Sequence, residues 1–70
     1  MRLACDTGGT FTDLVVEDDG EIRQFKASTV PADPVAGVLE VLALAARGYG
    51  LDRAEFLGRA STFVHGTTRA

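Results

Sequence analysis

The fold is decided by the stretch Asp6-Thr7-Gly8-Gly9-Thr10-Phe11-Thr12-Asp13. This stretch follows a short apolar-leaning run at residues 3–5 and precedes an apolar run at residues 14–16, so we expect a strand, a tight polar turn and a second strand. The two adjacent glycines have no Cβ atoms, which lets backbone N–H groups converge on an anion such as phosphate. A carboxylate at the end of the first strand, Asp6, can then hold a hard cation against the same anion. The stretch predicts a phosphate and magnesium loop.

An ordinary β-hairpin is the alternative interpretation of the same residues. Two glycines between apolar runs are also what a hairpin turn needs, with Asp and Thr side chains satisfying the backbone groups of the turn. The spacing matches neither the P-loop pattern nor the G-x-G-x-x-G fingerprint. Because a phosphate-binding hairpin is still a hairpin, the spacing alone leaves both interpretations open.

The composition is typical of one small folded domain that does not bind nucleic acid. The chain has 70 residues, of which 46% are hydrophobic and 24% charged, with two prolines and no low-complexity tract, so we expect no disorder. The formal net charge is −3, and the seven Lys and Arg residues are scattered along the chain. We therefore expect neither nucleic acid nor an anionic membrane surface as a partner.

The single cysteine and the absence of a long apolar run indicate the compartment. Cys5 has no partner for an internal disulfide, no Cys/His spacing resembles a zinc site, and we expect Cys5 to be a small buried residue. The start of the sequence lacks the apolar run of a secretory signal, and the longest apolar region is interrupted by Gly37, Glu40 and Arg47. We expect a soluble, cytoplasmic protein.

Periodicity and turn residues predict the strands. They are expected at residues 2–6, 12–17, 21–27 and 59–64. The apolar run in the second strand is typical of a strand covered on both faces, and Ile22 and Phe25 are the expected apolar anchors of the third strand. Gly20 is expected to take positive φ in the hairpin turn between these two strands.

An amphipathic helix is expected from Pro34 to about Arg47, packed on the sheet. Asp33 is expected to cap its first N–H groups, and Gly48 to take the left-handed conformation at its end. Asp52 opens a short capped helical turn before the fourth strand. The apolar residues at three- and four-residue intervals are Val35, Val38, Leu39, Leu42, Ala45 and Ala46.

The predicted fold class is mixed α/β, in the order β-β-β-α-β. An antiparallel three-stranded meander comes first, and the helical crossover should place the fourth strand parallel to a strand of the meander. Binding loops collect at the carboxyl ends of such strands, where residues 6–13 and His65-Gly66-Thr67-Thr68 both lie. Taken alone, the second loop is also consistent with a plain loop whose histidine makes a structural hydrogen bond.

These two motifs together, DTGGTFTD at residues 6–13 and HGTT at residues 65–68, closely resemble the amino-terminal region of the hydantoinase A / 5-oxoprolinase family. The resemblance covers the whole chain in order and spacing. It implies a branch of the actin-like ATPase and sugar kinase superfamily, whose nucleotide lies between two ribonuclease-H-like halves. Family members include ATP-dependent hydrolases of cyclic amides such as 5-oxoproline and N-methylhydantoin, and subunits of acetone and acetophenone carboxylases.

The resemblance implies roles for individual residues. It makes Asp6 a catalytic carboxylate that binds Mg²⁺ beside the phosphates, and His65 a second catalytic residue. Asp13 is expected to hold the first loop through hydrogen bonds. The residues implied to bind ATP are Thr7, Gly8, Gly9, Thr10, Gly66, Thr67 and Thr68.

The expected function follows from the same resemblance. We expect residues 1–70 to be part of an amino-terminal domain of a longer ATP-dependent cyclic-amide hydrolase, which phosphorylates a lactam or carbonyl oxygen before hydrolysis. One wall of a cleft cannot hold phosphates in line, so the chain alone is expected to be inactive and to need the remainder of the same enzyme or a partner subunit. The alternatives are an acetone or acetophenone carboxylase-like subunit, a small-molecule kinase of the same superfamily, and a non-catalytic actin-like binding or assembly module.

Overall fold

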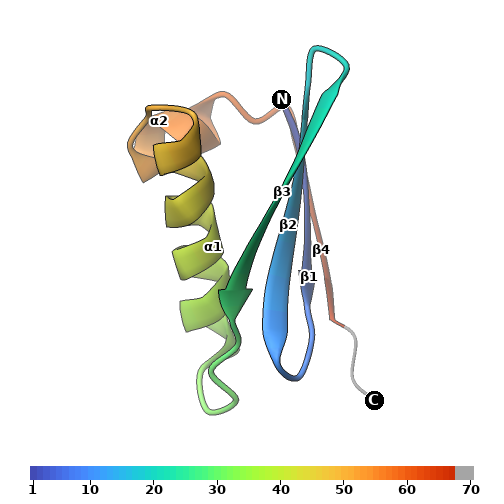
Figure 1. Cartoon of the computed structure of the whole chain (residues 1–70), viewed down its shortest axis with the longest axis vertical. Coiled ribbons are helices and arrows are strands. Elements are labelled where there is room, and N and C mark those ends of the chain that lie inside the picture. The colour runs from blue at the N-terminus through green and yellow to red at the C-terminus, as the bar shows by residue number, and fades with distance from the viewer. Residues whose placement is uncertain (68–70) are drawn as a thin grey trace.

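One four-stranded mixed sheet carries two helices on one of its faces (Figure 1). The computed structural model describes the backbone of residues 1–67 and the side chains of residues 1–66. The elements in chain order are β1 Arg2–Thr7, β2 Phe11–Asp18, β3 Glu21–Ser28, α1 Pro34–Gly48, α2 Arg53–Gly58 and β4 Thr62–Thr67. No helix in this part of the chain is long and apolar enough to span a membrane.

The strand order in the sheet is β3-β2-β1-β4. β1 pairs antiparallel with β2, and β2 with β3, whereas β4 returns after the two helices and pairs parallel with β1. The predicted mixed α/β class and β-β-β-α-β order are therefore confirmed. The turn between β2 and β3 has positive φ at both Asp19 and Gly20, 53° and 82°, which matches the twist of a two-residue hairpin.

The core lies between α1 and the face of the sheet that α1 covers. Side chains alternate between the two faces along a strand, so every second residue of β1 is buried. The expectation that Cys5 is buried is confirmed, and Phe56 brings α2 into the same cluster with no exposed surface. The buried apolar residues are Leu3, Cys5, Leu14, Val16, Ala27, Val41, Leu42, Ala45, Ala46 and Phe56.

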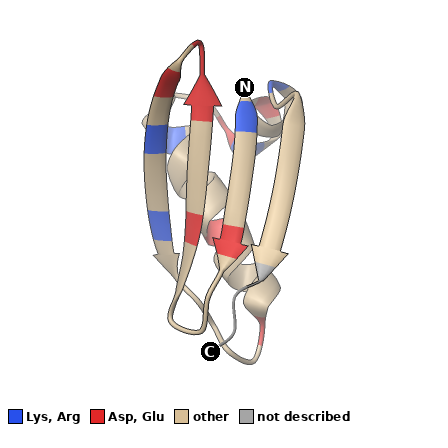
Figure 2. Cartoon of the chain, turned by 90° about the vertical axis from the view of Figure 1, so that its right-hand side faces the viewer, with Lys and Arg blue, Asp and Glu red and all other residues tan. Residues whose placement is uncertain are grey.

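The expectation that the apolar run of β2 is covered on both faces is wrong for the described residues. Figure 2 looks onto the uncovered face of the sheet, with the helices behind it. On this face Val64 is 59% exposed and Ile22 is 68% exposed, so Ile22 does not anchor β3. Phe25 lies on the opposite face and packs against the core, as predicted. A continuous apolar run therefore did not distinguish a strand covered on one face from a strand covered on both.

The buried stripe of α1 is displaced from the predicted one. Val35 and Leu39 are 61% and 43% exposed, whereas Val41, absent from the predicted set, is fully buried. The stripe is centred on Val41 and Ala45, so Leu39 lies at its margin. Periodicity identified the helix correctly but did not give the exact direction in which it faces the sheet.

The helix α1 begins at Pro34 as predicted, but the caps predicted at its two ends differ from the structure. Asp33 occupies the N-cap position of α1, but its side chain makes no capping hydrogen bond. At the other end Gly48 stays helical, and the left-handed residue is Gly50, with φ 71°. The N–H of Gly50 donates to Arg47 and the N–H of Leu51 to Ala46, which is the double hydrogen bond of a Schellman motif.

Local hydrogen bonds also set where α2 begins and where β4 begins. The Asp52 carboxylate accepts the N–H of Glu55 at 2.7 Å, so the predicted cap of α2 is confirmed. β4 begins at Thr62 instead of residue 59, because the N–H groups of Arg59 and Ala60 still donate to carbonyls of α2.

Candidate functional site

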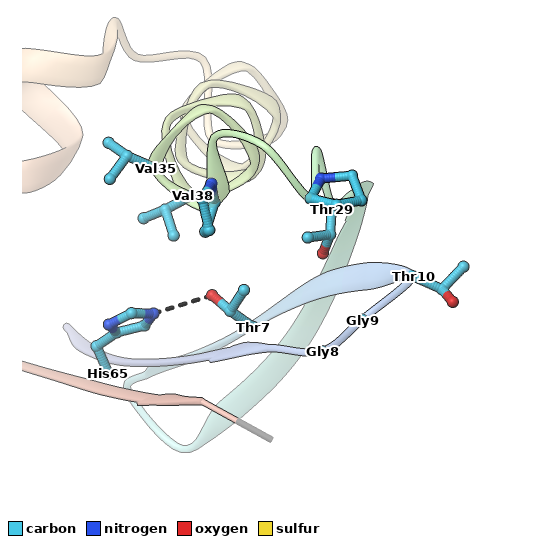
Figure 3. Close-up of a pocket in the computed structure, with 10 residues that line it drawn as sticks. Thr7, Gly8, Gly9, Thr10, Thr29, Val35, Val38 and His65 are labelled. Carbon is cyan, nitrogen blue, oxygen red and sulfur yellow. Dashed lines mark hydrogen bonds between the residues drawn. The ribbon is translucent and has the colours of Figure 1, made fainter. Parts of the chain in front are cut away.

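A pocket of about 630 Å³ lies where the β1–β2 turn, the end of β4 and the first turns of α1 meet (Figure 3). The turn and β4 form its floor, and α1 with the connector before it forms the facing wall. Its lining residues are Thr7, Gly8, Gly9, Thr10, Thr29, Pro31, Pro34, Val35, Val38 and His65. The pocket therefore brings the glycine turn together with His65, the first residue of the second polar loop.

Thr7 and His65 are hydrogen-bonded to each other at the floor of this pocket. The parallel register sets Cys5 opposite His65, and both Thr7 and His65 project from the helix-covered face. Thr7 Oγ1 lies 2.9 Å from His65 Nε2, and Thr7 is only 5% exposed while His65 is exposed. When Nε2 carries no proton, the Thr7 hydroxyl donates to it, which places the ring proton on Nδ1. The hydroxyl thus orients the imidazole.

The glycine turn is a hairpin, as one of the two interpretations predicted. The Gly8 N–H donates to the Phe11 carbonyl at 2.9 Å, and a Cβ at Gly8 would lie 3.1 Å from that oxygen. A Cβ at Gly9 would meet no heavy atom within 4 Å, so the backbone there is open to an approaching group. The Thr10 side chain points away from the pocket in Figure 3.

Contacts behind the turn hold the start of α1 above the pocket. The Thr29 N–H donates to the Thr10 carbonyl at 2.8 Å, and the hydroxyls of Thr12 and Thr29 are 2.9 Å apart. Gly37 packs so closely on β2 that its Cβ position would be 2.8 Å from Thr12 Oγ1. These contacts bring Val38, one residue further along the helix, to the pocket wall.

Asp6 lies on the other face of the sheet from Thr7 and His65. β1 alternates exposed and buried residues, and Asp6 is exposed on the face that the helices leave uncovered. Across the sheet Asp6 is opposite Asp13 of β2 and Gly66 of β4. Figure 2 shows acidic residues at the lower ends of both β1 and β2. The two residues predicted as catalytic therefore do not share one pocket.

Asp13 makes an ion pair with β3. Its Oδ1 lies 3.6 Å from Lys26 Nζ and has no hydrogen-bond partner among the described residues. The Lys26 ammonium also lies 5.0 Å from the centre of the Phe11 ring. The expected hydrogen bonds from Asp13 to the loop are thus replaced, at this oxygen, by a charge pair across the β2–β3 ladder.

A metal site made of protein ligands alone does not exist in the described residues. No three His, Cys, Asp or Glu side chains in this part of the chain come together as a metal site. Mg²⁺ usually keeps several waters and is held by one or two carboxylates together with substrate phosphates. Asp6 and Asp13, opposite each other in the β1–β2 register, are the carboxylates on this face of the sheet, and Asp13 is already paired with Lys26.

The buried thiol beside these carboxylates is held in its protonated form. The pKa of Cys5 is raised by its burial and, secondarily, by the negative charges of Asp6 and Asp13. A raised pKa lowers the thiolate fraction, and the thiolate is the nucleophilic form. Cys5 therefore packs in the core with its thiol favoured over the thiolate.

The second polar loop is split by the sheet. His65 lies in the pocket, whereas Gly66 faces the other way, and a Cβ there would be 4.0 Å from the Asp6 carboxylate. Thr67 ends β4 in its backbone, opposite Thr7. Thr68 lies outside the described residues.

The sequence did not predict the apolar wall of the pocket. The sequence predicts that Val35 and Val38 pack in the core and assigns no role to the connector before α1. Val38 does pack against the core while it also lines the pocket, whereas Val35 is 61% exposed. Two valines on the first turns of a helix that begins beside two prolines were the available signal, but their role depends on which element lies opposite. The lining residues missed are Thr29, Pro31, Pro34, Val35 and Val38.

Comparisons with known proteins identify the family of this chain. The family model described as the hydantoinase/oxoprolinase N-terminal region matches residues 2–70. The chain is 37% identical over 70 residues to the caprolactamase subunit alpha of Pseudomonas jessenii, an overlap of 99% of this chain and 10% of that protein. The chain thus spans about a tenth of the length of this relative. It belongs to the hydantoinase/oxoprolinase family and corresponds to the N-terminal region of that family.

Proposed function

We propose that this region forms one wall of the active site of an ATP- and Mg²⁺-dependent cyclic-amide hydrolase. The observation that carries the proposal is that Gly9, in the glycine turn, and His65, in β4, line a common pocket in a chain of the hydantoinase/oxoprolinase family. The relative from Pseudomonas jessenii is named a caprolactamase, and a lactam is a cyclic amide. The remainder of the site would come from the rest of the same protein or from a partner subunit.

The glycine turn would hold the phosphates of ATP. The open space at Gly9 supports this, because a phosphate can approach the backbone without meeting a side chain. The Gly8 N–H already closes the hairpin, so the Gly9 and Thr10 N–H groups are the donors we assign to the phosphate. When bound, ATP supplies the phosphoryl group that turns the amide oxygen, a poor leaving group, into a good one.

Asp6 would hold Mg²⁺ from the uncovered side of the sheet. It is exposed and stands one residue before the last residue of β1, next to the turn. Gly66 beside it leaves room around the carboxylate, since even a Cβ there would come no closer than 4.0 Å. In this assignment the metal ion lies on the uncovered face of the sheet and the pocket lies on the helix-covered face, with the glycine turn between them.

His65 would exchange a proton with the substrate, held in position by Thr7. The exposed imidazole can take or give a proton in the pocket, and the buried Thr7 hydroxyl fixes its orientation. Proton transfer to or from the amide is the step that this pair can assist without any other residue of the chain.

Ring opening by the complete protein tests the proposal. Wild-type protein is expected to open caprolactam, 5-oxoproline or hydantoin only with ATP and Mg²⁺, releasing ADP in step with product. Asp6→Asn should lower kcat by at least about 100-fold, because it removes the charge that holds the metal. Asp19→Asn, at an exposed turn at the far end of the sheet, is the matched control and should be unchanged.

Two results would overturn parts of this proposal. Ring opening without ATP would remove the nucleotide from the mechanism, and undiminished activity of the Asp6→Asn variant would remove the metal role of Asp6.

We also assign the protein to the cytoplasm, which cell fractionation with an antibody against this region would test.

A further inference from the structure

A row of charged side chains crosses the uncovered face of the sheet next to the glycine turn. The strand registers put Lys26 of β3 opposite Asp13 of β2, and Asp13 opposite Asp6 of β1. Figure 2 shows this row as one blue band and two red bands towards the lower ends of the three strands. Two negative charges and one positive charge therefore lie at the same end of this face.

The ammonium of Lys26 is held on the side of this row that faces the turn. Its Nζ lies 3.6 Å from Asp13 Oδ1 and 5.0 Å from the centre of the Phe11 ring. Phe11 lies two residues nearer the turn than Asp13 and begins β2 directly after Thr10. The contact with both side chains therefore brings the ammonium towards the turn, where the N–H groups of Gly9 and Thr10 are the donors assigned to phosphate.

The ion pair between Lys26 and Asp13 leaves the ammonium able to bind a ligand. The two side chains are 55% and 32% exposed, and exposed ion pairs contribute little to stability. The separation of 3.6 Å is too long for a hydrogen bond, and Asp13 Oδ1 has no hydrogen-bond partner among the described residues. A lysine ammonium has three N–H donors, which a phosphate oxygen can accept.

The charge balance beside the turn calls for a cation at this place. ATP brings several negative charges to a turn that already lies next to Asp6 and Asp13, and like charges repel each other. In the part of the chain that the structure describes, Lys26 is the one Lys or Arg at this end of the sheet. The others lie at the start of β1, against the end of α1 or on the helices: Arg2, Arg23, Arg47, Arg53 and Arg59.

We infer that Lys26 is a phosphate-binding residue of the site, and that Asp13 and Phe11 hold its ammonium beside the glycine turn. The inference rests on the proposed function, in which the turn binds the phosphates of ATP, and adds a residue to it. With the nucleotide bound, the ammonium donates to a phosphate oxygen while the Phe11 ring stays beneath it.

Nucleotide binding by the complete protein tests the inference. Calorimetry with Mg²⁺ and a non-hydrolysable ATP analogue measures Kd. Lys26→Met keeps the length of the side chain but removes the charge, and it should raise Kd by about 10-fold, as for the loss of one hydrogen bond to a charged group. The ratio of the two Kd values should shrink in 1 M salt, where the screening length is about 3 Å. Lys26→Arg keeps the charge and should keep most of the affinity.

Arg2→Met is the matched control for Lys26→Met. Arg2 Nη1 pairs with Glu17 Oε1 at 3.5 Å, in an exposed cross-strand ion pair on the same face but at the opposite end of the sheet. Both variants lower the charge of the chain equally, so Arg2→Met should leave Kd unchanged. Equal effects of the two variants would show that only total charge matters, and an unchanged Kd in Lys26→Met would leave Lys26 as a surface ion pair. Either result overturns the inference.

Phe11→Leu tests how the ammonium is positioned. Phe11 is 45% exposed, so leucine is tolerated there, and the change removes the ring beside Lys26. The variant should raise Kd by less than Lys26→Met does, and it should have no effect when Lys26 is already methionine. A loss of affinity that persists in the double variant would overturn the positioning role of Phe11.

Pyrophosphate binding and ring opening separate the inference from the proposed function. Binding of pyrophosphate with Mg²⁺ that is weakened by Lys26→Met supports the inference even if no ATP-dependent ring opening is found, an outcome in which only the proposed function fails. ATP-dependent ring opening with the same Kd in wild type and Lys26→Met leaves the proposed function standing and overturns the inference. A wild-type protein that binds neither pyrophosphate nor the ATP analogue overturns both.

Discussion

A Cβ atom at Gly37 would lie 2.8 Å from the Oγ1 of Thr12, closer than Cβ atoms approach heavy atoms to which they are not bonded. Thr12 is fully buried, and its hydroxyl also bonds to Thr29 in the connector before α1. The absence of a side chain at Gly37 is therefore what lets α1 approach β2. This contact sets the height of Val38 above the pocket floor.

Gly37→Ala should destabilise the protein although alanine favours helix. Overpacking against Thr12 costs about 1–3 kcal/mol, and the better helix propensity returns only about 1 kcal/mol. We expect a lower midpoint in urea unfolding. Gly58→Ala, where a Cβ would meet nothing within 4 Å, should be neutral or slightly stabilising. Equal stability of the two variants would contradict a tight helix–sheet contact.

Thr7→Val should impair His65 without disturbing the fold. Valine matches threonine in shape at this 5% exposed site but removes the hydroxyl that bonds to Nε2. We expect kcat to fall by about 10- to 100-fold, less than the loss of a complete acid–base catalyst. Nitrogen NMR of His65 should show a change in the ratio of ring tautomers. Thr62→Val, at an exposed position of β4, should change neither.

Asp52→Ala and Asp33→Ala form a matched pair at the two helix starts. The Asp52 carboxylate accepts the Glu55 N–H at 2.7 Å, so its removal should cost about 1 kcal/mol of unfolding free energy. Asp33 makes no side-chain cap bond, and its loss should cost less than about 0.5 kcal/mol. Chemical denaturation of both variants measures the difference, and similar costs would show that Asp33 also caps.

Cys5 should make stability fall at alkaline pH. Burial and the charges of Asp6 and Asp13 raise the folded-state pKa above the ordinary value of 9.0. Above pH 9.0 the unfolded thiol loses its proton before the folded one does, so the native state binds more protons and unfolding free energy falls as pH rises. Cys5→Ala should reduce this slope between pH 9 and 11. An identical slope would mean that the pKa is not raised.

Local chemistry explains what could be predicted from the sequence. The Asp19-Gly20 turn needs positive φ at both residues, and Asp52 lies three residues before an N–H that needs an acceptor. Both features depend on a few consecutive residues, so the sequence could predict them. The strand and helix order followed from periodicity in the same way. The two polar motifs identified the family.

A short stretch of sequence could not predict which face of the sheet a side chain occupies or which element lies against it. Ile22 and Phe25 look alike as apolar residues of β3, but the helices cover only the face to which Phe25 belongs. Gly48 and Gly50 are both suited to end α1, and Gly50 does so because the helix continues through Gly48 to complete the Schellman bonds. Each of these outcomes depends on which surface a neighbouring element occupies.

The candidate site shows most clearly what the sequence could predict and what only the tertiary structure decided. Residue types and spacing indicated that Asp6, Thr7 and His65 belong near a phosphate-binding turn at one edge of a sheet. Only the tertiary structure put Asp6 on one face and Thr7 with His65 on the other, because neighbouring residues of a strand project in opposite directions. The apolar wall likewise exists only because Gly37 lets α1 lie close to β2, a contact between residues far apart in the chain.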